Sequence, residues 1–195
     1  MKKARLWLAG GICLIVIGLV LGWSPLKQYW QGTHNVTTSS PFTHVADAAP
    51  ANTKHAAVIE GTATRIQIPS LHLDLPVIDG YYNKQAKTWT LTEDKVQYAT
   101  TTPENNNQEG NTFLYGHYRR GVFETLHTIQ PGAQVIITTD NNHTFTYRYR
   151  SAYVTNPNDD SLFKYQGPPI MTIQTCSGAW YQNRQLFVFD LVSAT

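Results

Sequence analysis

The chain begins with its longest uncharged and mostly apolar stretch, which runs from 6 to 23. As a helix, this stretch is long enough to cross about 30 Å of hydrocarbon. Three basic residues precede it, and Trp7 and Trp23 lie at its ends, where aromatic rings favour the membrane interface. The pattern predicts a cytoplasmic positive flank at 1–5, one transmembrane anchor at 6–23 and an extracellular remainder at the cell membrane. A cleaved signal peptide is the alternative, and Pro25 disfavours cleavage here.

Residues 24–57 lose this apolar character and are dominated by Thr, Ser, Pro and Ala. Apolar periodicity is absent, so the segment has too little apolar surface to build a core. Its three histidines, His34, His44 and His55, lack the spacing of metal ligands. We expect 24–57 to be an extracytoplasmic linker between the anchor and a folded domain.

From residue 58 onward, apolar and polar residues repeat with the period of two that β-strands require. The expected strands are Val58–Ile68, Leu71–Leu75 (ended by Pro76), Gly110–Gly116, the hairpin pair Ala133–Thr139 and Thr144–Val154, Ile170–Thr175 and Leu186–Val192. Only Phe123–Leu126 suggests a short helical turn. Residues 58–195 are therefore expected to form one all-β domain, either a barrel or a sandwich.

The charge balance changes once the N-terminal flank is set aside. The chain carries 15 Lys and Arg against 13 Asp and Glu, and Lys2, Lys3 and Arg5 belong to the flank. The remainder is therefore slightly acidic, which argues against a nucleic-acid partner because such proteins gather basic residues on the folded domain. The basic excess instead marks the membrane end of the chain.

The chain has two cysteines, Cys13 in the apolar stretch and Cys176 near the C-terminus. Residues placed so differently are not expected to pair, and two cysteines are too few for a zinc site with four cysteine ligands. No carboxylate cluster suggests a calcium site. The sequence therefore predicts no metal and no organic cofactor.

Three residues that suit nucleophilic catalysis lie at the ends of expected strands. Cys176 follows the strand Ile170–Thr175, His117 follows Gly116, and Arg184 opens the last strand. A strand end beside a loop is both rigid and open, which suits a nucleophile. A cysteine thiolate can attack a backbone carbonyl, a histidine can protonate the leaving amine, and an arginine can stabilise the oxyanion.

Each of these residues also has a simpler interpretation. A lone cysteine is more often a small core residue, and a histidine at a strand end can simply pack there. Arg119 and Arg120 lie close to His117 in the sequence and compete with Arg184 for the arginine role.

These residues lie in motifs that resemble those of the sortases, which are membrane-anchored cysteine transpeptidases of bacteria. The family pattern Thr-Leu-x-Thr-Cys is matched by Thr172 to Cys176, with Ile173 in place of Leu. The similarity extends over about 58–192 through Ile66-Gln67-Ile68-Pro69, Leu75-Pro76-Val77, Gly110-Asn111, Gly116-His117, the Phe123, Leu126, Ile129 and Gly132 series, and Arg184 to Val188. Thr100 to Asn107 depart from the family's usual Thr-x-x-Pro-Gly turn, so no subfamily or sorting motif is assigned.

The resemblance implies a closed β-barrel of about eight strands with short helical turns at 58–195. It also implies a catalytic set of Cys176, His117 and Arg184. Such an enzyme cleaves a Leu-Pro-x-Thr-Gly-like sorting signal of secreted surface proteins through a thioacyl intermediate. It then passes the acyl group to an amine of a peptidoglycan precursor or of a pilin lysine.

Four further residues are candidates for support or substrate binding. Thr175 either assists the site through its hydroxyl or is simply a good strand residue, and Ser177 follows the candidate nucleophile directly. Tyr118 and Trp180 suit the lining of a peptide groove, although packing at a rim explains such aromatic residues equally well.

Rival functions predict different arrangements. In an L,D-transpeptidase, Ser-x-Gly directly precedes the cysteine, whereas here Ser177-Gly178 follow Cys176. In papain-like peptidases the cysteine precedes the histidine, whereas here His117 comes first. A non-catalytic anchored β-domain, such as an adhesin or a sensor, predicts a buried and inert Cys176. The discriminating observation is whether the three candidates meet at one open groove.

Overall fold

The structure, a computed structural model, describes residues 57–178 and 180–195. The predicted flank at 1–5, the anchor at 6–23 and the linker at 24–57, except its last residue, lie outside this part of the chain. Among the described residues, no helix has both the length and the apolar character needed to cross a membrane.

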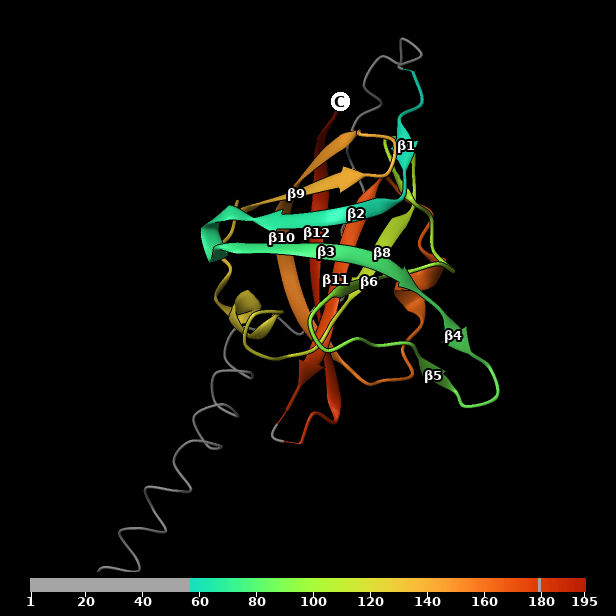
Figure 1. Cartoon of the computed structure of the whole chain (residues 1–195), viewed down its shortest axis with the longest axis vertical. Helices are drawn as coiled ribbons and strands as arrows, with labels where there is room; N and C mark the ends of the chain where they lie inside the picture. The colour runs from blue at the N-terminus through green and yellow to red at the C-terminus, as the bar shows by residue number, and fades with distance from the viewer. Residues whose placement is uncertain (1–56, 179) are drawn as a thin grey trace, which may run out of the picture.

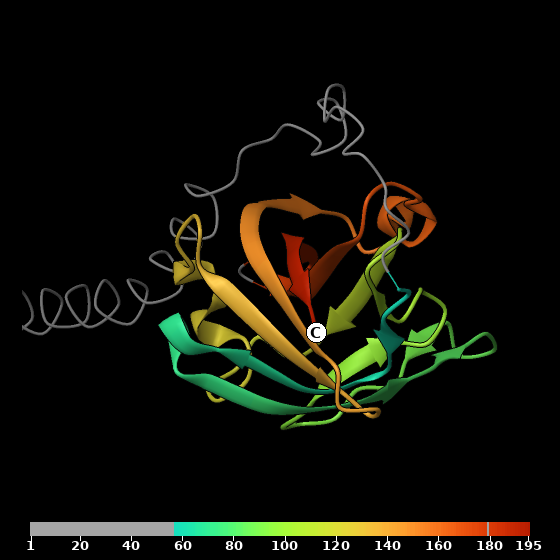
Figure 2. The same ribbon diagram turned by 90° about the horizontal axis from the view of Figure 1, so that it is seen from above.

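Eight strands close into a barrel in the order β10-β12-β11-β8-β6-β3-β2-β9 (Figures 1 and 2). These strands are β2 (Ala63–Ile68), β3 (Leu73–Gly80), β6 (Val96–Ala99), β8 (Asn111–Tyr115), β9 (Gln134–Thr139), β10 (Thr144–Thr155), β11 (Ile170–Ser177) and β12 (Asn183–Ala194). The all-β prediction is confirmed, and the structure decides for the barrel over the sandwich.

Shorter elements lie outside the barrel sheet. They are the pair β1 (Glu60–Gly61) and β7 (Asn105–Asn106), the hairpin β4 (Tyr82–Asn83) and β5 (Thr88–Trp89), and the 3₁₀ turns η1 (Pro69–Leu71), η2 (Glu124–Thr128) and η3 (Ser161–Lys164). The β4–β5 hairpin projects beyond one end of the barrel (Figure 1). The turn η2 confirms the short helical turn expected near Phe123–Leu126.

The alternating pattern explains which side chains fill the barrel. Side chains that point inward share one continuous core, which includes Ile66, Leu114, Ile137, Phe145, Ile173, Phe187 and Phe189. On β11, Met171 and Ile173 belong to this core, so Gln174 and Cys176, which lie at the opposite parity, face outward. The hydrophobic pattern of β11 therefore fixes the face on which Cys176 is displayed.

A second apolar cluster covers part of the outer face. It consists of Ala99, Phe113, Tyr115, Leu162 and Leu186, with Trp89, Tyr153 and Phe163 packed against it. Because β8, β11 and β12 are neighbours in the sheet, this cluster lies on the same face as Cys176.

One expectation about the strands was wrong, and one strand was missed. Pro76 does not end its strand but lies inside β3, which continues to Gly80. The pairing of β3 with β6 begins only at Val77, so Pro76 has a paired strand on one side alone, a position that tolerates proline. β6 was not expected, because the alternation over its four residues, Val96–Ala99, is too short to stand out, although all four are buried.

Candidate active site

Neighbouring strands present the three candidate residues at the same end of the barrel. Cys176 and Arg184 are direct partners in the antiparallel pair of β11 and β12. In the parallel pair of β8 and β11, Gln174 lies opposite Tyr115. His117 lies two residues after Tyr115, and Cys176 lies two residues after Gln174. The two candidates are therefore at the same height along the barrel. The fold therefore brings Cys176 between the other two candidates.

The backbone before His117 is fixed from both sides. The Thr175 hydroxyl donates a hydrogen bond of 3.0 Å to the Gly116 carbonyl, and the Gly116 amide donates one of 3.1 Å to the Gln174 carbonyl. The Phe123 amide then donates to the carbonyl of His117 itself at 3.2 Å. Thr175 is only 2% exposed, so its hydrogen bond is shielded from water. This arrangement ties the position of His117 to the strand that carries Cys176.

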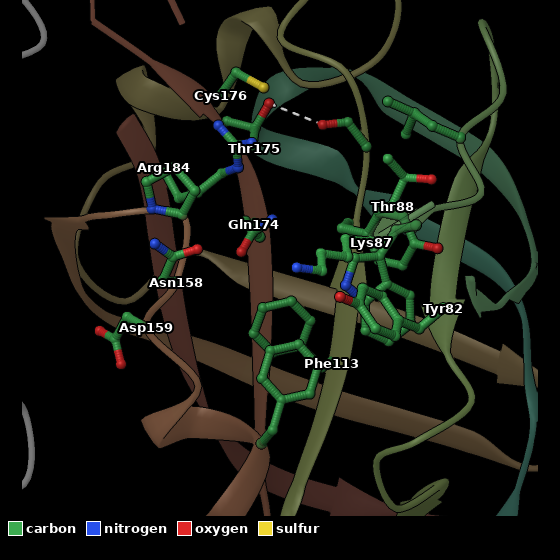
Figure 3. A pocket seen from close by; sticks show the side chains of 16 residues that line it. Tyr82, Lys87, Thr88, Phe113, Asn158, Asp159, Gln174, Thr175, Cys176 and Arg184 are labelled. Carbon is green, nitrogen blue, oxygen red and sulfur yellow. Dashed lines mark hydrogen bonds between the residues drawn. The ribbon is translucent and has the colours of Figure 1, made fainter. Parts of the chain in front are cut away.

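Arg184 lies beside the thiol without a countercharge. Its Nη1 donates to the carbonyls of Tyr181 at 3.2 Å and Asn183 at 3.1 Å, and among the described residues it forms no ion pair. Cys176 is a free and half-buried thiol, and Figure 3 shows the Arg184 guanidinium close to it. The arginine therefore keeps charge and hydrogen-bond donors available at the position where an oxyanion would form.

The competing arginines have other surroundings. Arg119 pairs with the carboxylate of Glu93, and Arg120 is exposed on the same loop. Neither residue lines the cavity that contains Cys176. The geometry favours Arg184 for the arginine role.

Cys176 and Arg184 open into a cavity of about 470 Å³ on the outer face of the barrel (Figure 3). This volume lies in the range of pockets that hold small molecules or short peptide segments. Phe113 and Tyr115 form its floor, and Gln174 and Thr175 of β11 line it next to Cys176. The β4–β5 hairpin provides one wall and the segment 157–163 the other.

Aromatic contacts hold the two walls to the floor. Trp89 on the hairpin stacks on Phe163 of η3 with ring centroids 5.8 Å apart and meets the edge of Tyr115 at 5.4 Å. Phe163 also stacks on Phe113 at 4.4 Å. Trp89 and Phe163 were not singled out from the sequence, because their role depends on this packing.

The remaining predicted residues lie outside the cavity lining. His117 is half-exposed at the neighbouring strand end, and Trp180 is 87% exposed. Tyr118 is half-buried and contacts the rings of Tyr181 and His127 at 6.3 and 6.2 Å, and burial raises its pKa. The hydroxyl of Ser177 is buried without a hydrogen-bond partner among the described residues. The structure thus brings Cys176, Arg184 and Thr175 to one cavity, with His117 beside it.

No group of three or more His, Cys, Asp or Glu side chains within 57–178 and 180–195 has an arrangement that could hold a metal ion.

Comparisons with known proteins identify a family. Residues 66–192 match the family model of the Sortase domain, which is well over half of the chain. Among curated proteins the sequence finds no match.

Solved structures share the fold. Sortase E1 from Streptomyces coelicolor is 22% identical with a TM-score of 0.54, and the alignment covers 69% of this chain and 90% of that one. Sortase D5 from Clostridium perfringens is 24% identical with a TM-score of 0.54 over 68% and 79% of the two chains. SrtA from Actinomyces oris is 15% identical with a TM-score of 0.58 over 73% and 89%.

Proposed function

Because the chain belongs to the sortase family of cysteine transpeptidases, we propose that it cleaves a Leu-Pro-x-Thr-Gly-like sorting signal and joins the cut protein to an amine. The observation that carries this proposal is the pairing of Cys176 with Arg184 across β11 and β12 at the mouth of a cavity. His117, which leaves β8 at the same level, completes the set.

The reaction proceeds in two transfers. The Cys176 thiolate attacks the carbonyl of the threonine, and Arg184 donates hydrogen bonds to the oxyanion that forms. His117, as imidazolium, protonates the departing amine, which leaves a thioester on Cys176. An acceptor amine then gives its proton to neutral His117 and attacks the thioester, which forms the new amide and releases the thiolate.

The cavity supports a peptide substrate. Its floor carries the rings of Phe113 and Tyr115, with Trp89 and Phe163 above them, which suits the leucine and proline side chains of the signal. Sortase E1 from S. coelicolor was solved with a tripeptide in its active site. The acceptor is an amine of a peptidoglycan precursor or a pilin lysine, and the chemistry requires no metal or organic cofactor.

The location proposed for this reaction is the outer face of the cell membrane. Sortases are generally membrane-associated with an extracellular domain, and the apolar stretch at 6–23 with its basic flank at 1–5 supports the same topology here. The linker at 24–57 would then separate the barrel from the bilayer. No nucleic-acid partner is part of the proposal.

The non-catalytic alternative, an anchored adhesin or sensor domain, gains no support. It predicts an inert and buried cysteine, whereas Cys176 is half-buried and lines a cavity together with Arg184, and His117 lies beside that cavity at the neighbouring strand end.

The test uses the full chain in detergent, a panel of sorting peptides and an added amine such as triglycine. Intact mass spectrometry should detect a peptide adduct on Cys176, and chromatography should detect the amide product. Cys176→Ala and His117→Ala should abolish both, and Arg184→Ala should lower product formation at least about a hundredfold. Arg120→Ala, on an exposed residue of the neighbouring loop, is the matched control and should leave the rate unchanged. Product formation by Cys176→Ala would overturn the proposal.

A further inference from the structure

The cavity beside Cys176 carries an excess of available positive charge. Its charged lining residues are Lys87, Asp159 and Arg184. Both carboxylate oxygens of Asp159 are engaged in its own loop, where they accept hydrogen bonds from the Thr155 hydroxyl at 2.6 Å and the Ser161 amide at 3.0 Å. Figure 3 shows Asp159 turned away from the centre of the cavity. Asp159 keeps its negative charge, but because it is turned away from the centre, Lys87 and Arg184 are the charged groups that reach into the cavity.

Lys87 is directed into the cavity by the turn between β4 and β5. The side chain of Asn83 stabilises this turn, because its Oδ1 accepts hydrogen bonds from the amides of Gln85 at 3.0 Å and Ala86 at 2.9 Å. Lys87 follows with a φ of 53°, a left-handed conformation that glycine and asparagine adopt more easily. Figure 3 shows its side chain extending across the cavity toward Gln174. Among the described residues, the ammonium of Lys87 forms no hydrogen bond or ion pair, so it is available to a ligand.

Lys87 and Arg184 act at different levels of the groove. Arg184 is the strand partner of Cys176, whereas Lys87 extends toward Gln174, two residues earlier on β11. Two strand residues span about 7 Å, so the ammonium lies away from the position of the oxyanion. An extended peptide acylated at Cys176 advances by about 3.3 Å per residue, which brings its next side chain into the reach of a flexible lysine.

We propose that Lys87 makes this groove select sorting signals with an acidic side chain at the variable position x, directly before the acylated threonine. The inference rests on the proposed function, because it assumes that a peptide lies along β11 with its carbonyl at Cys176. The ammonium of Lys87 pairs with the carboxylate of the peptide as the peptide displaces water from the cavity. A neutral side chain at x gains nothing from this charge, and a basic one is repelled.

The experiment compares three peptides that differ only at x, namely Glu, Gln and Lys in Leu-Pro-x-Thr-Gly. Values of kcat/KM are measured with the full chain, with Lys87→Gln and with Lys87→Glu. Lys84→Gln is the matched control, because Lys84 belongs to the same exposed turn but does not line the cavity. Thermal unfolding checks that each variant folds. Binding of the same peptides to the Cys176→Ala protein, followed by fluorescence anisotropy, reports on the groove independently of catalysis.

We expect the wild-type protein to favour Glu over Gln by about twofold to fivefold, as a single ion pair of an exposed lysine allows. The preference for the Glu peptide should vanish in Lys87→Gln and persist in Lys84→Gln. In Lys87→Glu, the peptide with Lys at x should be preferred instead. The wild-type preference should also weaken as NaCl rises from about 0.05 M to about 0.5 M.

Equal values for Glu and Gln in the wild-type protein, or a preference that survives Lys87→Gln, would overturn the inference while leaving the transpeptidase proposal intact. Failure of the proposed function looks different, since then no peptide forms an adduct on Cys176 at all. In that case the anisotropy measurement still decides whether Lys87 confers a preference for acidic peptides.

Discussion

The hydrogen bond from Thr175 to Gly116 is the contact that most directly couples the two strands of the candidate site. In Thr175→Val the shape of the side chain is kept, but the donor to the Gly116 carbonyl is lost. A buried hydrogen bond contributes about 0.5–1.5 kcal/mol net, and a carbonyl left unpaired costs about 1–3 kcal/mol. For a domain of this size, a loss of about 1–2 kcal/mol lowers the Tm by about 3–8 °C.

The effect on activity distinguishes a positioning residue from a residue that only stabilises the strand. If the bond holds the backbone before His117 in register with Cys176, its loss displaces the imidazole in the transition state. We then expect kcat to fall about tenfold, equivalent to about 1.4 kcal/mol, with KM for the sorting peptide changed by less than about twofold. The assays are differential scanning fluorimetry and steady-state transpeptidation by the full chain.

Thr172→Val provides a matched control on the same strand. Thr172 is fully buried, and its hydroxyl donates a bond of the same length, 3.0 Å, to the Asn111 side chain. Because Asn111 begins β8, far along the strand from His117, this variant should lose comparable stability and keep its kcat. Equal kcat values for Thr175→Val and the wild-type protein, with a lowered Tm, would refute the positioning role and leave Thr175 as a strand residue.

Three further predictions concern the cavity wall, the nucleophile's neighbour and the core. Trp89→Ala removes the stacking on Phe163 and should raise KM for the sorting peptide about tenfold with a smaller effect on kcat; an unchanged KM in peptide titrations would contradict it. Ser177→Ala removes a buried hydroxyl without a partner among the described residues, so the Tm should stay the same or rise, and a fall above about 3 °C in a melting curve would reveal a hydrogen bond. Burial raises the pKa of Tyr147 from 10.0 to about 12, so between these values the unfolded chain loses the proton first and folding stability declines by about 1.4 kcal/mol per pH unit. In urea titrations from pH 9 to about pH 12, Tyr147→Phe should therefore show a shallower loss of stability than the wild-type protein, and equal slopes would refute this account.

The sequence predicted those parts of the fold that depend on local alternation. The strands β9, β10, β11 and β12 appear close to their expected positions, because their apolar residues repeat with a clear period of two. β6 was missed because its alternation covers only four residues, and its pairing with β8 joins segments that are distant in the sequence. Whether the strands form a barrel or a sandwich also depends on long-range pairing, such as that of β2 with β9, which no local pattern encodes.

The candidate site divides in the same way. Cys176, His117 and Arg184 could be proposed from the sequence because each lies near the end of a strand with a clear pattern and within a sortase-like motif, and pairing then places Cys176 directly opposite Arg184. Lys87 and Trp89 could not be found, because they reach the cavity only through the packing of a projecting hairpin against η3.

This division has a functional consequence. The groups assigned to the chemistry are held by the register of the barrel strands. A register shift by one residue would turn Cys176 toward the core and expose the apolar side chains of the whole strand. The walls of the proposed peptide cavity are held by a few aromatic contacts between Trp89, Phe163 and Tyr115, which can change without altering strand pairing. Substitutions in 81–91 and 157–163 should therefore alter which peptide is accepted while the barrel and its reaction stay the same. The peptide preference of this chain has to be sought in its hairpin and in the loop that precedes β11, and not in the motif around Cys176.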